Sequence, residues 1–83
     1  MKLTVKYFAS IREAVGQGME TVHTSAGTLA ALRDELVARG GEYAHSLARG
    51  KAVRVALNQV MSEETAALTE GCEVAFFPPV TGG

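Results

Sequence analysis

Residues 28–39 read TLAALRDELVAR, the longest helical pattern in this chain of 83 residues. Thr28 has the short oxygen-bearing side chain that caps a helix start, and Gly40-Gly41 ends the pattern. The core-facing stripe has the spacing i, i+3, i+7: Leu29, Leu32 and Leu36. The charged residues are expected on the solvent side: Arg33, Asp34, Glu35 and Arg39. We expect one main helix here and a single further turn around Tyr43–Leu47.

Two strand patterns precede this helix. Residues 3–8 alternate apolar and polar side chains, and residues 19–24 are rich in β-forming side chains. Ser10 and Glu13 have the spacing of a capping box, which predicts a short helix that ends at Gly16. The helical turn lengthens the connection, so we expect the two strands to pair as a wide hairpin.

Three more strand patterns follow the main helix. Residues 53–57 alternate, Asn58-Gln59 marks a turn, and residues 60–61 are expected to pair back. The last strand, residues 73–77, ends at Pro78-Pro79 because proline cannot donate a ladder hydrogen bond. One main helix can cover one face of a mixed sheet of four or five strands. The fold class is therefore α+β, with a single folded domain over residues 1–77.

Composition excludes several classes of protein. The net charge of −1 and the lack of a basic stripe disfavour nucleic-acid binding. No apolar run approaches the roughly 20 residues that cross a bilayer, and the N-terminus does not resemble a targeting signal. We therefore expect a cytoplasmic protein that touches no membrane. A single cysteine, Cys72, and two separated histidines, His23 and His45, make a metal site improbable.

Residues 78–83, PPVTGG, form a tail whose composition suits a chemical role. The two prolines favour an extended exit from the last strand. Gly82 and Gly83 carry no side chain, so they can thread a narrow channel and leave the terminal carbon open to a nucleophile. A tail of this kind suits a carboxylate that one partner activates and another receives. We expect Cys72, five residues before the strand ends, to have no part in this chemistry.

The tail and several inner motifs resemble one family. Residues 76–83, FFPPVTGG, resemble the end of the small subunit of molybdopterin synthase, a sulfur carrier of the ubiquitin-like β-grasp superfamily. The inner motifs that carry the resemblance are Tyr7-Phe8-Ala9, Arg12-Glu13, Gly16, Ala56-Leu57-Asn58-Gln59, Leu68-Thr69, Gly71 and Glu73-Val74-Ala75. Cys72 departs from the polar residues common at that turn. The resemblance spans essentially the whole chain and implies a ubiquitin-like β-grasp.

The resemblance also implies a mechanism and partners. An E1-like adenylyltransferase uses ATP to adenylate the carboxylate of Gly83, and a sulfur donor protein converts the adenylate to a thiocarboxylate. The tail, Pro78, Pro79, Val80, Thr81 and Gly82, then enters the large subunit of molybdopterin synthase. There the sulfur attacks cyclic pyranopterin monophosphate. The chain itself binds no cofactor, catalyses nothing alone and joins a heterotetramer with the large subunit.

Strand parity predicts a second contact surface. If Leu3, Val5 and Tyr7 face the helix, the alternation of side chains along the strand turns Phe8 to the opposite sheet face. If Val74 and Phe76 of the last strand face the helix, Phe77 points to that opposite face as well. In a β-grasp the first and last strands are neighbours. We therefore expect Phe8 and Phe77 to lie together on the open face, with Met61 nearby, as a docking patch for a partner.

Three alternatives share parts of this pattern. The first is a sulfur carrier for thiamine, cysteine or tRNA thiolation, which would use the same tail. The second is a ubiquitin-like modifier, which would form isopeptide bonds to lysines. The third is an interaction module with an inert tail, which would keep its function without Gly82 and Gly83.

Overall fold

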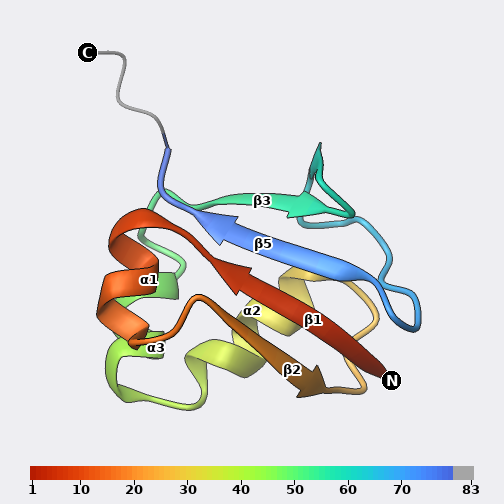
Figure 1. Cartoon of the computed structure of the whole chain (residues 1–83), viewed down its shortest axis with the longest axis horizontal. Coiled ribbons are helices and arrows are strands. Elements are labelled where there is room, and N and C mark those ends of the chain that lie inside the picture. Colours follow the sequence, from red (N-terminus) through yellow and green to blue (C-terminus); the bar gives the residue numbers. More distant parts are fainter. Residues whose placement is uncertain (80–83) are drawn as a thin grey trace.

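The computed structural model describes residues 1–79 as a five-stranded mixed sheet with three helices. Figure 1 shows the longest helix, α2, behind the sheet, whose strands lie side by side in the order β2-β1-β5-β3-β4. The elements, in chain order, are β1 (Lys2–Tyr7), α1 (Ala9–Val15), β2 (Met19–His23), α2 (Leu29–Val37), α3 (Gly41–Leu47), β3 (Arg54–Leu57), β4 (Val60–Ser62) and β5 (Glu73–Phe77).

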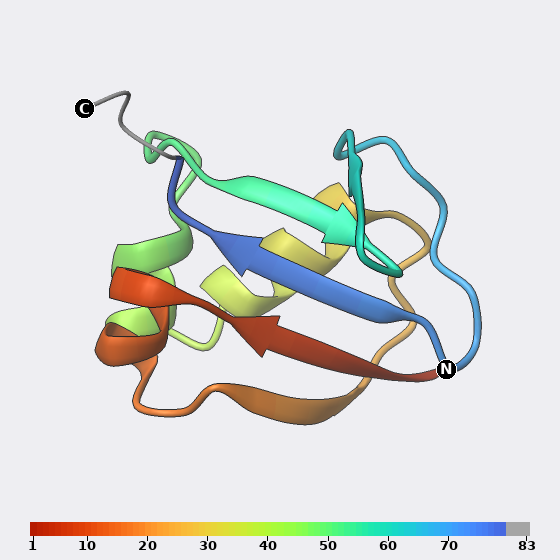
Figure 2. The ribbon, with the colours of Figure 1, turned by 45° about the horizontal axis from the view of Figure 1, so that its top comes forward.

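The sheet has the topology that the sequence led us to expect. β1 and β5 run parallel at its centre, whereas the other neighbouring pairs are antiparallel. Parallel neighbours need a long crossover, and α2 is part of that connection (Figure 2). The expected α+β class, the wide β1–β2 hairpin and the contact between first and last strands are all confirmed. The arrangement is a β-grasp.

The β3–β4 turn is made by Asn58 and Gln59, as predicted. Both residues have positive φ, 50° and 68°. This is the geometry of a two-residue type I′ hairpin turn, in which asparagine is favoured. The Asn58 side chain also accepts a hydrogen bond from the backbone N–H of Glu73 at 2.9 Å. The turn is thereby fixed to the start of β5.

The predicted capping box of α1 is wrong. The helix begins at Ala9, and Phe8 occupies the N-cap position without a side-chain cap. The start is set by the sheet instead, because the Phe8 N–H donates to the Phe76 carbonyl at 3.1 Å and holds the end of β1. Ser10 therefore falls inside the first turn. The predicted end is confirmed, since Gly16 caps α1 in the left-handed region at φ 83°.

Helix α2 buries the predicted leucine stripe, and the Thr28 hydroxyl caps it by accepting from the Ala31 N–H at 3.2 Å. One prediction fails here, because Arg33 is only 3% exposed. Its guanidinium donates to the carbonyls of Leu47 and Ala48, both at 2.7 Å. A buried arginine is tolerated where every donor finds an acceptor, and these acceptors lie far along the chain.

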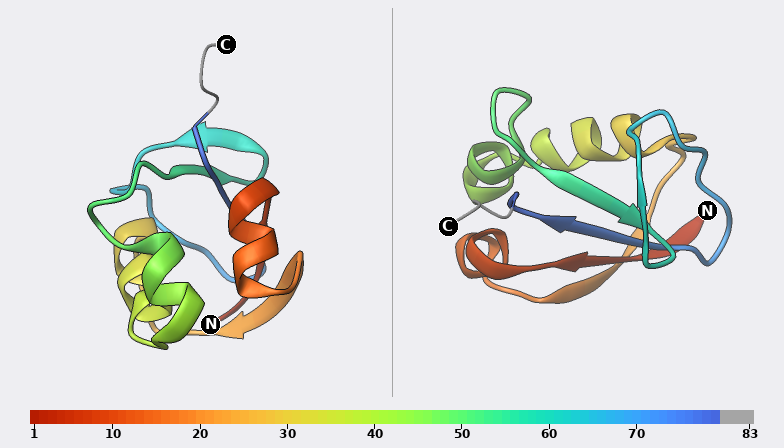
Figure 3. Two further views of the ribbon diagram at one scale, coloured as in Figure 1. Left: turned by 90° about the vertical axis from the view of Figure 1, so that its left-hand side faces the viewer. Right: turned by 90° about the horizontal axis from the view of Figure 1, so that it is seen from above.

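Helix α3 is longer than the single turn expected around Tyr43–Leu47. It packs against both α1 and α2, and Figure 3 shows α1 and α3 side by side at one end of the sheet. Leu47 is fully buried, so α3 closes the core that α2 alone would leave open at this end. Within the core the rings of Tyr7 and Phe76 stack with centroids 6.3 Å apart.

Candidate functional site: the chain exit and the open sheet face

The exit of the tail is fixed by the centre of the sheet. β5 lies between β1 and β3 and ends at Phe77, which is paired with Arg54 of β3. Pro78 and Pro79 follow, and they are the last described residues. The predicted tail contacts of Val80, Thr81 and Gly82, and the chemistry predicted for Gly83, lie outside the described residues. They stay predictions.

Phe8 and Phe77 meet beside this exit. Their rings make an edge-to-face contact with centroids 6.1 Å apart. Phe8 is 46% exposed, which is unusual for so large an apolar ring. Both rings therefore lie on the sheet face opposite α2, as the alternation of side chains along the strands predicted. Their predicted role in binding a partner is not tested by the structure.

The open face continues as one row across all five strands. The backbone register sets Met19 opposite Lys6, Lys6 opposite Ala75, Ala75 opposite Ala56, and Ala56 opposite Met61. Side chains directly opposite in a ladder share a face, so Met61 lies on the predicted face. The two methionines are 60% and 52% exposed, while both alanines are buried. The row is mostly apolar, with Lys6 as its one charged member and a flexible thioether at each edge.

Met19 is the member of this face that sequence reasoning missed. The strand pattern of residues 19–24 was recognised, but a wide hairpin leaves its register open. Only the observed pairing of Met19 with Lys6 assigns its side chain to the open face. The available signal was the presence of a large apolar side chain at the start of an edge strand.

The charges on this face are mainly basic. Lys6 is paired with Glu73 at 3.3 Å, and both side chains are partly exposed. Arg54, opposite Phe77, is exposed and makes no ion pair within residues 1–79. A partner surface that covers the aromatic pair would therefore meet an unneutralised guanidinium. Acidic groups at that point would be favoured.

A cluster of polar side chains lies next to β1 on the helix-covered side of the sheet. The hydroxyls of Tyr7 and Tyr43 donate to the same Glu20 oxygen at 2.7 and 2.9 Å. Arg39 approaches both Glu20 oxygens at 3.0 Å, and its guanidinium lies 4.8 Å from the Tyr43 ring centroid. One carboxylate thus joins β1, β2, α3 and the end of α2.

The ionisation of this cluster follows from its contacts. Burial opposes the charged form of Glu20, but hydrogen bonds from Tyr7, Arg39 and Tyr43 together outweigh it and lower the pKa of the carboxyl. Burial, followed by the hydrogen bond to Glu20, raises the pKa of Tyr7 far above its usual value. Glu20 is therefore charged and Tyr7 neutral at neutral pH. The cluster supports the fold and offers no nucleophile.

Other candidate chemistry is not assembled by the described part of the chain. Within residues 1–79 no three His, Cys, Asp or Glu side chains lie together in a way that could hold a metal ion. Cys72 is buried and lies one residue before β5, at the opposite end of that strand from Phe77. Across the same residues, no helix has the length and apolar character needed to span a membrane.

Comparison with known proteins agrees with the sequence resemblance. The model of the ThiS family matches residues 5–83. Two curated relatives are both named molybdopterin synthase sulfur carrier subunit. The one from Escherichia coli (strain K12) is 42% identical over 81 residues, and the one from Haemophilus influenzae is 40% identical over 81 residues. Each alignment covers 98% of this chain and 99% of the relative.

Solved structures share the fold. The putative molybdopterin converting factor, subunit 1, from Pyrococcus furiosus has a TM-score of 0.79 at 27% identity, covering 96% of this chain and 99% of that chain. A complex of subunits 1 and 2 of the molybdopterin-converting factor from Helicobacter pylori contains a chain of the same fold, with a TM-score of 0.69 at 24% identity and both chains fully covered. The chain described here belongs to the ThiS family and, within it, to the molybdopterin synthase sulfur carrier subunits.

Proposed function

We propose that this chain carries sulfur as a thiocarboxylate on Gly83 and delivers it during the synthesis of molybdopterin. The observation that carries the proposal is the exit of the chain. The central strand β5 ends at Phe77, beside the exposed ring of Phe8 and six residues before the final glycine. The reactive end and the apolar face can therefore engage one partner together.

Activation begins with an oxygen of the Gly83 carboxylate. It attacks the α-phosphorus of ATP in an E1-like adenylyltransferase, which forms an acyl-adenylate and releases pyrophosphate. A sulfur donor protein supplies a persulfide, whose outer sulfur displaces AMP and forms an acyl disulfide. A thiol then cleaves the sulfur–sulfur bond, which leaves the thiocarboxylate on Gly83 and a disulfide between that thiol and the donor. The glycines at 82 and 83 support this route, because neither places a side chain beside the acyl carbon. ATP is a substrate of the activating enzyme and is not held by this chain.

Transfer takes place in the large subunit of molybdopterin synthase. The thiocarboxylate sulfur attacks a carbon of cyclic pyranopterin monophosphate and displaces an oxygen substituent from it, so a new carbon–sulfur bond joins Gly83 to the pterin as a thioester. Water then cleaves the acyl–sulfur bond of this thioester, so the sulfur stays on the pterin and the Gly83 carboxylate is restored. Two such transfers build the dithiolene. We assign the general acid and base steps to the large subunit, as the family resemblance implies.

Docking uses the open face and the tail together. Phe8 and Phe77 are the expected anchors, because large aromatic rings at the centre of an interface carry most of its binding energy. Met19 and Met61 flank them and adapt to the partner surface. The tail, Pro78 to Gly82, threads a channel, where its prolines reduce the conformational entropy lost on binding.

Reconstitution with the purified large subunit tests this proposal. We expect the chain thiocarboxylated at Gly83 to convert cyclic pyranopterin monophosphate, and the chain lacking Gly83 to bind the large subunit yet transfer no sulfur. Sulfur transfer by the truncated chain would contradict the proposal. Accumulation of conjugates linked to lysines, with no sulfur on the pterin, would instead assign the chain to the protein modifiers.

A further inference from the structure

The aromatic pair on the open face borders an arginine. The register of β3 with β5 sets Arg54 directly opposite Phe77, and side chains that are opposite in a ladder share a face. On the other side of β5, the Phe8 ring meets the Phe77 ring edge to face, with centroids 6.1 Å apart. Phe8, Phe77 and Arg54 therefore form one row, the exit row, at the end of the sheet where the chain leaves it (Figure 1).

The guanidinium of Arg54 has no acidic partner among residues 1–79. The residue is exposed, and none of the ion pairs formed by the described residues includes it. Glu63 follows β4 directly and would stand opposite Arg54 if the β3–β4 ladder ran one residue further, yet the two make no ion pair. Lys6, on the adjacent row of the same face, is already paired with Glu73 at 3.3 Å. Arg54 is therefore the cation beside the aromatic pair that is free to meet a partner.

We propose that Arg54 selects the docking partner, because its guanidinium pairs with a carboxylate of the large subunit beside the place where Phe8 and Phe77 are covered. This inference rests on the proposed function, in which the large subunit covers the open face. Covering the two rings removes water from the neighbouring guanidinium, and a charge that loses its water without gaining a partner weakens binding. A carboxylate compensates this loss, since it accepts two parallel hydrogen bonds from a guanidinium. A basic or apolar surface at the same place leaves Arg54 unpaired, so the residue discriminates against such partners.

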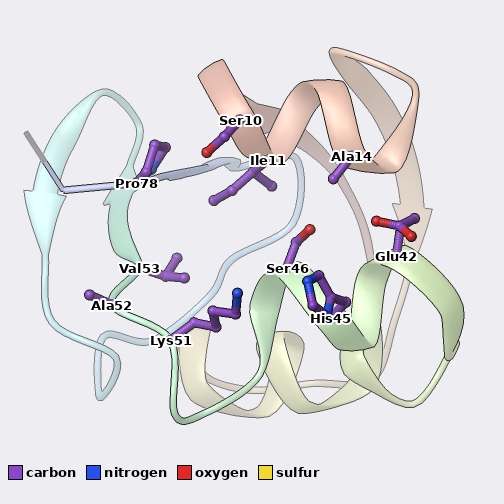
Figure 4. Close-up of a pocket in the computed structure, with 10 residues that line it drawn as sticks. All are labelled: Ser10, Ile11, Ala14, Glu42, His45, Ser46, Lys51, Ala52, Val53 and Pro78. Atoms are coloured by element: carbon purple, nitrogen blue, oxygen red, sulfur yellow. The ribbon is translucent and has the colours of Figure 1, made fainter.

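A second unpaired cation near the exit provides a matched control. Figure 4 shows the Lys51 side chain extending into a groove of about 430 Å³ between α1 and α3, with Pro78 also lining it. Lys51 makes no ion pair within the described residues. It resembles Arg54 in charge and in closeness to the exit, but it lines this groove instead of the open face. A general attraction to an acidic partner would involve both cations, whereas a specific pair on the open face involves only Arg54.

Calorimetric titration with the purified large subunit separates these two cases. We expect Arg54→Gln to weaken binding by more than about fivefold, the most that a solvent-exposed ion pair contributes. Arg54→Lys should weaken it less, because the charge is kept, and Lys51→Gln should change it by no more than about twofold. A loss smaller than about fivefold for Arg54→Gln, or an equal loss for Arg54→Gln and Lys51→Gln, would overturn the proposal.

A crosslink identifies the partner group directly. A water-soluble carbodiimide joins an amine to a carboxylate in contact with it, which forms an amide and releases the carbodiimide as a urea. A guanidinium does not take part in this coupling. In the complex of the Arg54→Lys chain with the large subunit, we expect position 54 to be joined to an aspartate or glutamate of the large subunit. Coupling of other lysines of the chain to the large subunit, with none at position 54, would overturn the proposal.

Sulfur transfer distinguishes the failure of this inference from the failure of the proposed function. Arg54 takes no part in the chemistry, so the Arg54→Gln chain should transfer sulfur at the unaltered rate when the large subunit is saturating. Intact transfer together with unchanged binding by Arg54→Gln would overturn the inference alone. An unaltered thiocarboxylated chain that binds through Arg54 but transfers no sulfur would contradict the proposed function and leave the ion pair standing.

Discussion

Arg33 is the one charged residue among residues 1–79 that is buried in the fold. It donates to the carbonyls of Leu47, Ala48 and Lys51 and to the carboxylate of Glu64, at 2.7 to 3.1 Å. Its side chain is only 4% exposed. It therefore ties α2 to the segment that leaves α3 and leads into β3.

Arg33→Met keeps the aliphatic stem and removes all four of these hydrogen bonds. Breaking a buried ion pair from one side costs about 3–5 kcal/mol. The partner carboxylate of Glu64 is 30% exposed, so the lower end, about 3 kcal/mol, is expected. An 83-residue domain has about 4–12 kcal/mol in total. The melting temperature should fall by about 12–24 °C.

Urea denaturation followed by circular dichroism measures this loss, with an unchanged m-value as the sign of an intact native state. Arg49→Met is the matched control. Arg49 also contacts Glu64, but its side chain is 50% exposed, so its removal should shift the midpoint far less. Equal midpoints for the two variants, or a loss below about 1 kcal/mol for Arg33→Met, would refute the reasoning that burial sets the cost.

Three further predictions follow from single residues. Phe77→Ala should weaken binding to the large subunit about 30-fold or more in calorimetry, the effect of losing an anchor worth about 2 kcal/mol. Val60→Ala, at an exposed position with the opposite parity to Met61, should leave binding unchanged. Glu20 has a lowered pKa, so its stabilisation is complete above the unfolded pKa near 4.5 and is lost as pH falls through the folded pKa. Glu20→Gln should therefore flatten the decline in urea stability below about pH 4.5, and an unchanged acid decline would contradict this. Gly16→Ala should cost about 1 kcal/mol in thermal unfolding, because only the positive φ opposes a Cβ there. Gly50→Ala, with open space and no positive φ, should be neutral or slightly stabilising.

Periodic patterns in the sequence predicted most of the fold. The leucine stripe of α2 and the alternation in β1 and β5 are local signals, so each element was found close to its observed bounds. Parity alone also put Phe8 and Phe77 on one face, because a strand residue has only two directions to point.

Features set by contacts distant in the sequence were missed. Arg33 was expected to face solvent, because helical periodicity reports only on residues of the same helix. The groups that accept its hydrogen bonds lie 14 to 31 residues further along the chain. The start of α1 was misplaced because a hydrogen bond from Phe8 to Phe76 outweighs the local signal at Ser10. The face assignment of Met19 required a register that no turn motif specified.

The candidate chemistry was available from the sequence in a different way. This chemistry depends on Gly83, which lies outside the described residues. The composition of the tail and the family resemblance identified it, and the fold shows where the chain leaves the sheet. Strand β5 presents the tail beside an exposed aromatic pair. A groove of about 430 Å³ between α1, α3 and the segment before β3 was not foreseen, because only the fold brings these segments together.

An intact mass spectrum tests the central claim most directly. The chain is measured before and after incubation with ATP, an E1-like activating enzyme and a sulfur donor from the same cell. The account predicts a mass gain that matches replacement of one oxygen by sulfur, absent when Gly83 is deleted. No gain in the full-length chain, while the same enzyme activates another carrier, would contradict a thiocarboxylate on Gly83.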